Sequence, residues 1–350
     1  MEIEEEIRVV IVPPNPREPY RRSFRPGIGP NPFLAYEHLE RQGIKTRFLD
    51  PTGRPWNPFA GRNPLLQSID PVRTAKIILQ QKHIDIVVSV TEGGAALLSL
   101  LKSALMPRVR VVIWDLMPVE DWQLSNRLLD ITIPRVDGIM VLGSNQGEYI
   151  RQRWNPSGKI VVIGHGVDTD FFQPRPIEPD GFILSVGEDA GRDFATLMRA
   201  AEGIQREVVI KSTRSAPLPH QSASRVRVVS KWMSYIELRE LYTQSALVVV
   251  PMRQTLNASG VSTILEASAM GRPLIVSDNI AIRDFIVPNE TCLMVPRDDP
   301  AALQAAIERL LQEPETCARL AAGARKFVET HCSPVVFAQR LGSALKIFAT

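Results

Sequence analysis

Short runs of aliphatic and β-branched residues recur along this 350-residue chain, and they constrain its fold more than any other feature. Most of these runs are apolar at consecutive positions, which is typical of strands buried on both faces of a parallel sheet. Stretches in which apolar residues recur with the period of a helix separate many of the runs. This alternation of strands and helices predicts a doubly wound α/β fold.

The predicted strands form two sets along the chain. The first set comprises residues 7–12, 84–90, 109–114, 138–142 and 160–163, and the second comprises residues 182–186, 207–210, 226–229, 246–250, 273–276 and 292–295. Helices are predicted over residues 31–42, 71–81, 94–104, 146–154, 193–202, 234–244, 261–270, 300–312, 315–331 and 334–349. The Pro- and Arg-rich residues 13–30 are predicted to form a long loop after the first strand.

A division into two domains follows from the length and from one Pro-rich stretch. Residues 173–176, Gln-Pro-Arg-Pro, separate the two strand sets and have the composition of a linker. One hydrophobic core seldom serves more than about 250–300 residues. We therefore expect Rossmann-like domains over residues 1–170 and 177–332, followed by a C-terminal helix over residues 333–350.

The composition excludes several classes of protein. Hydrophobic residues make up 44% of the chain and charged residues 23%, which excludes a disordered or low-complexity chain. The 41 Lys and Arg residues exceed the 38 Asp and Glu residues by only three charges. Because a dedicated nucleic-acid binder concentrates far more positive charge, we expect no nucleic-acid partner.

The cysteines and the apolar runs indicate the compartment. The three cysteines, Cys292, Cys317 and Cys332, are odd in number and form no Cys-x-x-Cys pair, as expected of a reduced cytoplasmic protein. No apolar run reaches the roughly 18–20 residues of a membrane span. The acidic start of the chain lacks the basic region of a secretory signal. No spacing of histidines and cysteines indicates a metal site.

The strongest functional pattern is NASGVSTILEASAMGRPLIVSD, residues 257–278. Its small residues would let the backbone approach a ligand, and a helix is predicted to begin near Val261, where free N–H groups could bind phosphate. Glu266, one turn inside the helix, could accept hydrogen bonds from ribose hydroxyls. Gly271 would end the helix in a left-handed conformation. The alternative is an ordinary helix cap followed by a solvated glutamate.

This segment resembles the nucleotide-sugar-binding signature of glycosyltransferase family 4, the retaining group 1 enzymes with the GT-B fold. Three further segments agree: IVVIGHGVDTDFFQP at residues 160–174, FILSVGEDAGRDFATLMRAA at residues 182–201, and the section from GRPLIV at residue 271 to DPAAL at residue 299. The resemblance covers residues 160–311 closely and residues 1–159 loosely. It implies two Rossmann-like domains facing a cleft, with the last helix crossing back to the N-terminal domain.

The resemblance also implies a reaction. Such enzymes move a sugar from a nucleotide diphosphate sugar to a hydroxyl acceptor with retention at the anomeric carbon, without a metal or another cofactor. The family stabilises the diphosphate with an Arg after the first strand of the donor domain and a Lys a few residues later. In this chain Glu188 stands at the first position and Arg192 at the second. Arg192 keeps a positive charge that could bind phosphate, and its alternative role is an exposed arginine at a helix start.

The rest of the donor site follows from the same resemblance. Glu266 matches the second glutamate of the family's paired motif, whose role is to hold the ribose. The first glutamate falls at Ala258, so its task near the sugar would pass to backbone amides or to neighbouring polar side chains. The residues expected to bind the nucleotide sugar at this helix start are Asn257, Ser259, Gly260, Val261 and Ser262.

Two residues at other strand ends could complete the donor site. Lys211 follows a predicted strand and could supply a second positive charge, or it could be a solvated lysine. Trp232 lies in the loop after residues 226–229, where the base is expected, and could stack on it. Its alternative role is core packing between the loop and a helix.

In the N-terminal half, Gly27 and Gly29 stand where the family has a glycine-containing loop, and they could admit the donor diphosphate. A basic cluster beside them could bind a phosphate-bearing acceptor or an anionic membrane, or could be a solvated loop. This cluster comprises Arg17, Arg21, Arg22 and Arg25. A peripheral contact with the inner face of a membrane is therefore a further expectation for the cytoplasmic protein.

Two acids of the N-terminal half are the candidate catalytic residues. Asp115 follows Trp114, which replaces the histidine that the family often has after a middle strand. Glu92 begins a helix and could touch the sugar or the acceptor, although an acid there also favours the helix dipole.

A retaining glycosyltransferase of the GT-B type is therefore the leading hypothesis. The substitutions at Glu188, Trp114 and Ala258 leave open a non-catalytic GT-B protein that binds a nucleotide or a partner. A sugar-nucleotide epimerase on the same fold would need a histidine and acid–base carboxylates that this sequence does not bring together.

Overall fold

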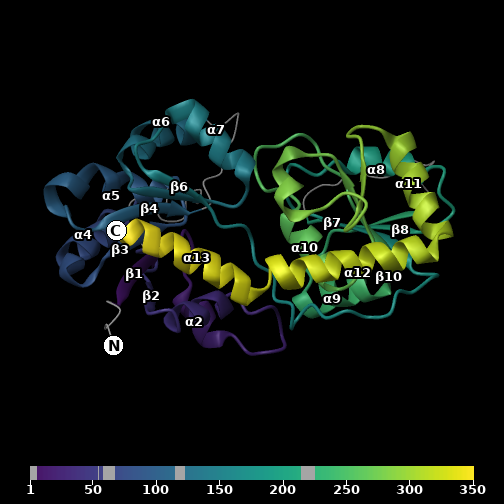
Figure 1. The fold of residues 1–350 in the computed structure, drawn as a ribbon, viewed down its shortest axis with the longest axis horizontal. Helices are drawn as coiled ribbons and strands as arrows, with labels where there is room; N and C mark the ends of the chain where they lie inside the picture. Colours follow the sequence, from purple (N-terminus) through teal and green to yellow (C-terminus); the bar gives the residue numbers. More distant parts are fainter. Residues whose placement is uncertain (1–5, 54, 58–67, 115–122, 214–224) are drawn as a thin grey trace. The chain divides into compact units, whose positions relative to one another are not determined.

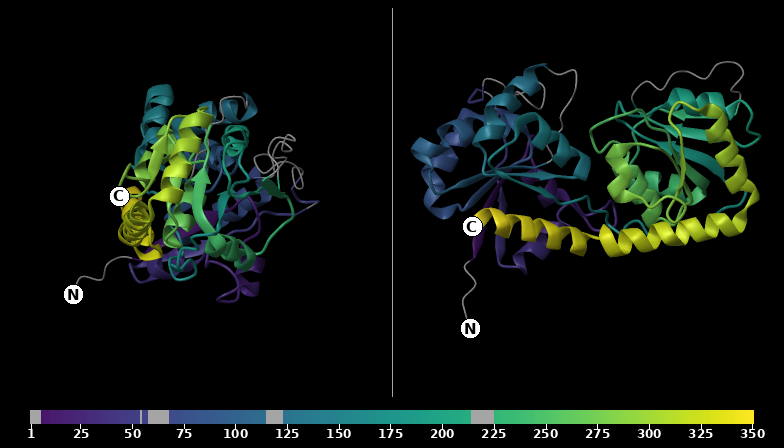
Figure 2. Two further views of the ribbon diagram at one scale, coloured as in Figure 1. Left: turned by 90° about the vertical axis from the view of Figure 1, so that its right-hand side faces the viewer. Right: turned by 45° about the horizontal axis from the view of Figure 1, so that its top comes forward.

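The computed structural model describes residues 6–53, 55–57, 68–114, 123–213 and 225–350, and Figure 1 shows the course of the chain. The chain forms two compact units. Unit 1 comprises Met1–Phe24, Phe33–Gly164 and Phe337–Thr350, and unit 2 comprises Arg25–Pro32 and His165–Val336. Figure 2 shows that each unit has its own sheet with helices packed on it.

Unit 1 is built on a parallel sheet with the strand order β2-β1-β3-β4-β5-β6. Its strands are β1 (Ile7–Val12), β2 (Ile44–Phe48), β3 (Ile86–Ser89), β4 (Arg110–Trp114), β5 (Gly138–Val141) and β6 (Lys159–Val162). Its helices are α1 (Glu18–Ser23), α2 (Leu34–Glu40), α4 (Pro71–Gln80), α5 (Glu92–Leu105), α6 (Gln123–Thr132), α7 (Ser144–Trp154) and α13 (Pro334–Ala349), with 3-10 turns η1 (Gln81–His83) and η2 (Ile133–Arg135). The terminal helix α13 packs on this sheet, since the Phe348 ring covers Gly138 and Lys159 Nζ donates to Ile347 O at 2.9 Å.

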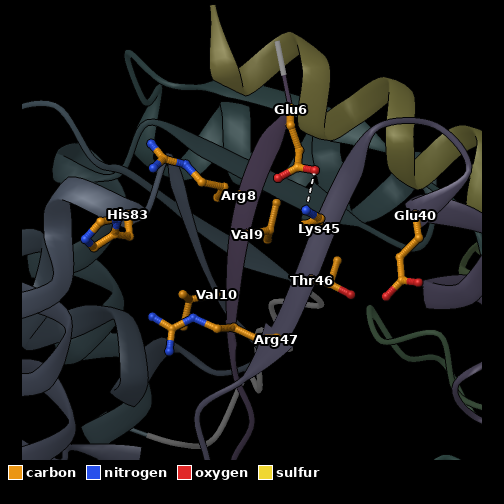
Figure 3. Close-up of a pocket in the computed structure, with 9 residues that line it drawn as sticks. All are labelled: Glu6, Arg8, Val9, Val10, Glu40, Lys45, Thr46, Arg47 and His83. Atoms are coloured by element: carbon orange, nitrogen blue, oxygen red, sulfur yellow. Dashed lines mark ion pairs between the residues drawn. The ribbon is translucent and has the colours of Figure 1, made fainter. Parts of the chain in front are cut away.

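A groove of about 440 Å³ lies beside β1 and β2 of unit 1 (Figure 3). The groove is lined by Glu6, Arg8, Val9, Val10, Glu40, Lys45, Thr46, Arg47 and His83. Its cations have partners within the unit: Lys45 Nζ lies 2.7 Å from Glu6 Oε2, and Arg47 Nη2 donates to Gln80 Oε1 at 2.7 Å. The groove therefore contains charges of both signs, and Lys45 and Glu6 compensate each other.

Unit 2 is built on a second parallel sheet, with the order β12-β11-β10-β7-β8-β9. Its strands are β7 (Phe182–Val186), β8 (Val208–Lys211), β9 (Val226–Val229), β10 (Ser245–Val250), β11 (Leu274–Ser277) and β12 (Leu293–Val295). Its helices are α8 (Phe194–Ala201), α9 (Tyr235–Gln244), α10 (Val261–Ala269), α11 (Pro300–Gln312) and α12 (Pro314–His331), with the 3-10 turn η3 (Ile280–Phe285).

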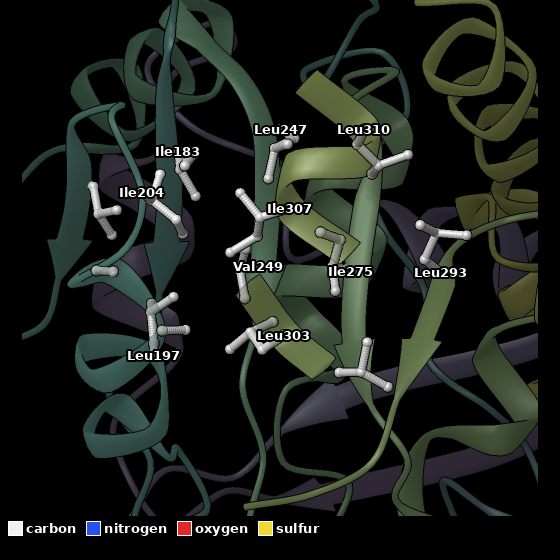
Figure 4. Packing of buried hydrophobic residues seen from close by; sticks show 14 of the residues in the cluster. Ile183, Leu197, Ile204, Leu247, Val249, Ile275, Leu293, Leu303, Ile307 and Leu310 are labelled. Atoms are coloured by element: carbon white, nitrogen blue, oxygen red, sulfur yellow. The ribbon is translucent and has the colours of Figure 1, made fainter. Parts of the chain in front are cut away.

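The core of unit 2 lies between the sheet and the helices on one of its faces (Figure 4). Ile183, Val249 and Ile275 point from neighbouring strands toward Leu303 and Ile307 of α11, and all five are buried. Complete burial of one such side chain contributes about 1.5–3 kcal/mol. This core fixes the strands of the unit and therefore the positions at which they end.

The strand order predicts where on each sheet a ligand can bind. In unit 2 the direction of chain progression reverses between β7 and β10, and in unit 1 it reverses between β1 and β3. In open α/β sheets, ligands bind in the crevice outside the carboxyl ends of the strands at this switch point. The loops that follow these four strands are therefore where functional side chains are expected.

The predicted fold class, two doubly wound α/β sheets, is confirmed, and every predicted strand is present. The strand β2 and the helices α1 and α6 were not predicted. The prediction of a continuous loop over residues 13–30 is wrong because Glu18–Ser23 form α1, whose start is fixed by hydrogen bonds from the N–H groups of Arg17 and Glu18 to Asp50.

The divisions between the units differ from the predicted domain limits at 170, 177 and 333. The contacts divide the chain after Gly164 and after Val336. Val167 N donates to Cys332 O at 2.8 Å, which fixes the start of the His165–Val336 segment to its end. Asn31 N donates to Asp168 Oδ2 at 2.8 Å, and the Arg25–Pro32 loop therefore belongs to unit 2 although it comes early in the sequence.

Candidate functional site

Two loops meet at the switch point of unit 2, one after β7 and one after β10. Arg253 N donates to Gly191 O at 2.8 Å, and Asp193 N donates to Pro251 O at 3.0 Å. A Cβ at Gly191 would lie 2.8 Å from Ser259 Oγ, so only glycine permits this close packing. The loops together form the edge to which most of the predicted donor-site residues belong.

Helix α10 begins at this edge without a side-chain cap. Gly260 is its N-cap residue and has a φ of 82°, a left-handed conformation that glycine adopts without strain. Since no side chain accepts the first N–H groups of the helix, a ligand oxygen could do so. Asn257 Oδ1 is buried and has no hydrogen-bond partner among the described residues. Val261 is buried, so only its backbone could contact a ligand, whereas Ser262 is exposed.

Arg192 lies behind the start of α10. Its side chain is only 3% exposed, so the alternative of an exposed helix-start arginine is wrong. Its Nε donates to Asp189 Oδ2 at 3.0 Å, and its Nη2 donates to Thr263 Oγ1 at 2.8 Å. The Thr263 hydroxyl in turn donates to Val186 O at 3.2 Å. The guanidinium is therefore held in one orientation between the end of β7 and the first turn of α10.

Lys211, the last residue of β8, is paired with an acid. Its Nζ lies 2.8 Å from Glu188 Oε1, and its side chain is 7% exposed, so the alternative of a solvated lysine is wrong. Glu188 Oε2 accepts from the Thr213 N–H at 2.7 Å and from the Thr213 hydroxyl at 2.6 Å. Burial raises the pKa of Glu188, but these hydrogen bonds outweigh that effect and hold its pKa below the ordinary value.

Glu266, on α10, is half-buried and accepts a hydrogen bond from the buried Tyr242 hydroxyl at 2.9 Å. Burial raises the pKa of Glu266 to about 7, although Tyr242 and the Arg192 charge act in the opposite direction. Burial also raises the pKa of Tyr242 well above its ordinary value. The alternative of a solvated glutamate is therefore wrong, and this carboxyl titrates near neutral pH.

The remaining predicted donor-site residues are Trp232, Gly27 and Gly29. Trp232 is 79% exposed in the loop after β9, so the alternative of core packing is wrong. Gly27 has a φ of 87° and no atom near its missing side chain. Gly29 packs on α9, where an added Cβ would lie 3.1 Å from Tyr235 Cδ2.

The basic cluster predicted at residues 17–25 is divided. Arg17, Arg21 and Arg22 belong to unit 1, at α1 or just before it, and Arg21 lies 3.6 Å from Glu18 in an ion pair. Arg25 belongs to unit 2. The described contacts thus assign the cluster to two separate units rather than to one.

In unit 1, Glu92 is the buried first residue of α5 and follows β3 at the switch point. Thr91 caps this helix by accepting from Gly94 N at 3.3 Å. Asp115 lies outside the described residues. Trp114, which precedes it, contacts the rings of Tyr36 and Phe337, with centroids 6.5 and 6.1 Å away.

Four site residues, Asp189, Thr213, Tyr242 and Thr263, were not found by sequence reasoning. The spacing of three residues between Asp189 and Arg192 was an available signal. Tyr242 and Thr213 meet Glu266 and Glu188 from 24 and 25 residues away, which no local pattern reveals.

The described residues contain no group of three or more His, Cys, Asp and Glu residues that could hold a metal ion. Within the same part of the chain, no helix has the length and apolarity needed to cross a membrane.

Comparisons with known proteins identify one matching family model and a set of similar folds. Residues 186–313 match the family model described as glycosyl transferases group 1. No curated protein matches the sequence significantly. Several solved structures are similar to nearly the whole chain. Three of them are 14–16% identical to it, and at this identity the likeness shows the fold alone.

Sucrose-phosphate synthase from Thermosynechococcus elongatus has a TM-score of 0.71 and 16% identity, over 98% of this chain and 99% of that one. A glycosyltransferase from Rickettsia africae has a TM-score of 0.70 and 14% identity, over 99% of both chains. HepE from Anabaena in complex with UDP-glucose has a TM-score of 0.67 and 14% identity, over 98% of this chain and 100% of that one. These structures are GT-B glycosyltransferases, and the chain shares their two-domain fold.

Proposed function

We propose a substrate class and a stereochemical course for this chain, which is a glycosyltransferase by its group 1 domain and its fold. The enzyme transfers a sugar from a nucleotide diphosphate sugar to a hydroxyl group of a glycan, a lipid or a small molecule. It does so with retention of the anomeric configuration and without a metal.

The observation that carries this proposal is the position of Arg192. Its buried, oriented guanidinium offers a positive charge at the switch point of the sheet. The uncapped start of α10 beside it offers helix N–H groups. When the glycosidic bond breaks, negative charge develops on the diphosphate leaving group. Oriented donors in a site shielded from water stabilise such charge strongly, since they need no rearrangement during the reaction.

Glu266 is the evidence that the diphosphate belongs to a nucleotide. Its Oε2 is fixed by Tyr242, and the residue as a whole is half-buried. A carboxylate held in this way can accept hydrogen bonds from two neighbouring ribose hydroxyls. The exposed Trp232 offers a ring for the base to stack on. HepE, of similar fold, is recorded with UDP-glucose, which makes a uridine diphosphate sugar the first donor to test.

The acceptor side of the proposal rests on the N-terminal unit. Glu92 lies at the switch point of that unit, where an acid could contact the sugar or orient the acceptor hydroxyl. Asp115 is proposed for the same task. Retention and independence from metal follow from the resemblance to glycosyltransferase family 4, and each has its own test.

Titration calorimetry with UDP-, GDP- and ADP-sugars tests the donor class. We expect one of these donors to bind, and Arg192→Met and Glu266→Gln to weaken its binding about 10- to 100-fold, the effect of losing a hydrogen bond to a charged group. Arg199→Ala, which removes an exposed arginine of the neighbouring α8, is the matched control and should bind like the wild type. The donor class is refuted if no nucleotide sugar binds, or if both site variants bind like the control.

Turnover separates an enzyme from the non-catalytic alternative. Slow hydrolysis of the bound nucleotide sugar is expected, and NMR of the released sugar should show the anomer present in the donor. An inverted first product would contradict retention. Loss of turnover in EDTA, restored by a divalent cation, would contradict independence from metal.

A further inference from the structure

Within the described part of the chain, three hydrogen-bond donors converge on one carboxylate at the carboxyl end of β8. They are Lys211 Nζ, at 2.8 Å from Glu188 Oε1, and the Thr213 N–H and hydroxyl, at 2.7 and 2.6 Å from Glu188 Oε2. The acid comes from the loop after β7, and the donors come from the end of the neighbouring strand and the residues after it. Glu188 therefore bridges two strand ends at the edge where the donor site lies.

This set of donors has the chemistry of an anion site. An ammonium, a backbone N–H and a hydroxyl are the groups that commonly bind phosphoryl oxygens, and hydrogen bonds to charged groups are the strong ones. A carboxylate satisfies the same donors because it presents two charged oxygens. Nothing in the three donors favours a carboxylate over a phosphoryl group.

The exposure of the two partners shows which one could leave. The side chain of Lys211 is 7% exposed, whereas that of Glu188 is 46% exposed. Glu188 therefore lies on the solvent side and covers the ammonium. Rotation about the side-chain bonds of Glu188 would uncover Lys211 without any movement of the strands.

The charges of the two ion pairs support the same conclusion. Arg192 and Lys211 bring two positive charges, but Asp189 and Glu188 bring two negative ones at 3.0 and 2.8 Å. A diphosphate that approached these two pairs would therefore meet little net positive charge from them. Its binding becomes favourable when one of the carboxylates moves away, and Glu188 is the more exposed of the two.

We propose that Lys211 Nζ and the N–H and hydroxyl of Thr213 form a phosphate subsite that the chain's own Glu188 occupies until a phosphoryl group displaces it. The identity of the natural ligand, a nucleotide diphosphate sugar, rests on the proposed function, but the subsite itself does not. Glu188 thereby competes with the ligand for the three donors and sets the affinity of the site for phosphate.

Inorganic pyrophosphate is the probe that tests the subsite without a nucleotide. Titration calorimetry compares the wild type with Glu188→Gln, which keeps the size of the side chain and removes its charge. We expect Glu188→Gln to bind pyrophosphate about tenfold more tightly or better, since an internal charge-assisted competitor has been removed. Glu207→Gln is the matched control, because Glu207 precedes β8 at the end of the strand opposite Lys211 and pairs with Arg227 of β9, and it should bind like the wild type.

Two further variants exclude an indirect effect. Lys211→Met in the Glu188→Gln background should abolish the gain, and Glu188→Ala should reproduce it, with far-UV circular dichroism verifying the fold of each. The proposal is overturned if Glu188→Gln binds pyrophosphate no better than the wild type does, or if the gain survives Lys211→Met. A gain in pyrophosphate affinity without any binding of nucleotide sugars would leave the subsite standing and refute the proposed donor. Binding of nucleotide sugars without a gain in pyrophosphate affinity would leave the proposed donor standing and refute the subsite.

Discussion

Two buried arginines, Arg73 in unit 1 and Arg192 in unit 2, have the same local design and different surroundings. Each lies three residues after an acid, Asp70 or Asp189, and each has a side chain almost inaccessible to water. Arg73 donates to backbone oxygens, to Pro13 O at 2.8 Å and Ser68 O at 2.9 Å. Arg192 donates to side chains, those of Asp189 and Thr263.

This difference in acceptors predicts a structural role for Arg73 and a binding role for Arg192. A backbone carbonyl can leave its donor only if the loop that contains it moves. A side-chain acceptor can leave by rotation, so its donor can be transferred to a ligand. Burial lowers the pKa of Arg73 to about 10, still high enough to keep it charged at neutral pH. We therefore interpret Arg73 as a clamp on the loop after β1 and Arg192 as a donor available to phosphate.

Arg73→Met tests the structural role of Arg73 and should have the largest effect of the variants considered. Removing the guanidinium leaves the buried Asp70 without its charged partner, and loss of one partner of a buried pair costs about 3–5 kcal/mol. Urea unfolding should show this loss of stability, and hydrogen exchange should locate it in unit 1. Nucleotide-sugar affinity of the folded variant should stay unchanged.

Arg192→Met is the matched variant in unit 2. Its loss of binding free energy for the nucleotide sugar should exceed its loss in free energy of unfolding. The reason is that Asp189 is partly exposed and can be solvated after the arginine is removed. If Arg73→Met costs no more stability than Arg192→Met, the distinction between backbone and side-chain acceptors does not separate the two roles.

Gly260→Ala tests how rigidly the site in unit 2 depends on its backbone. A left-handed conformation costs a residue with a Cβ about 1–2 kcal/mol. Overpacking adds about 1–3 kcal/mol, because the new Cβ would lie 2.9 Å from Met252 Sδ. We expect a clear loss of thermal stability and weaker nucleotide-sugar binding, since the start of α10 must shift.

Gly27→Ala is the control for conformation without crowding. Gly27 also has a positive φ, but its missing side chain faces open space. It should therefore cost only the conformational part, about 1–2 kcal/mol. Equal losses for the two glycine variants would show that packing against Met252 does not hold the start of α10.

The parts of the molecule that the sequence revealed are those with a local pattern. Fully apolar strands and capped helices were predicted, but β2, with the sequence IKTRF, was missed because this edge strand alternates apolar and polar residues over only five positions. In the site, the start of α10 and Glu266 were found from one continuous segment. The partners Tyr242 and Thr213 were missed because the fold brings them to Glu266 and Glu188 from distant strands and helices.

The pKa of Glu266 predicts a pH dependence that belongs to unit 2. The folded value of about 7 lies above the ordinary value of 4.5, so the protonated form is favoured in the folded state. The contribution of this group to stability is therefore present below pH 4.5 and is lost as the pH rises through 7. A ribose hydroxyl prefers the charged carboxylate, so affinity for UDP-glucose should rise about tenfold between pH 6 and 8, following the ionised fraction.

Two variants separate this titration from other groups. Glu266→Gln should bind UDP-glucose weakly and without this pH dependence. Tyr242→Phe removes a hydrogen bond that lowers the pKa of Glu266. The midpoint of the variant's affinity–pH curve should therefore lie at higher pH than that of the wild type. Calorimetry across this range measures both, and an unchanged slope in Glu266→Gln would assign the titration elsewhere.

Arg227→Ala is expected to have the smallest effect, and it shows why burial decides the comparison. Arg227, on β9, and Glu207, which directly precedes β8, form an ion pair at 2.7 Å, but both side chains of this pair are about half exposed. Exposed pairs contribute about 0–1 kcal/mol because water and salt screen the charges. The melting temperature should therefore change little, and pyrophosphate affinity should stay at the wild-type value. If Arg227→Ala instead raised or lowered that affinity as much as changes at Glu188 do, the general charge of unit 2 would govern phosphate binding, and a buried ammonium covered by one carboxylate would not.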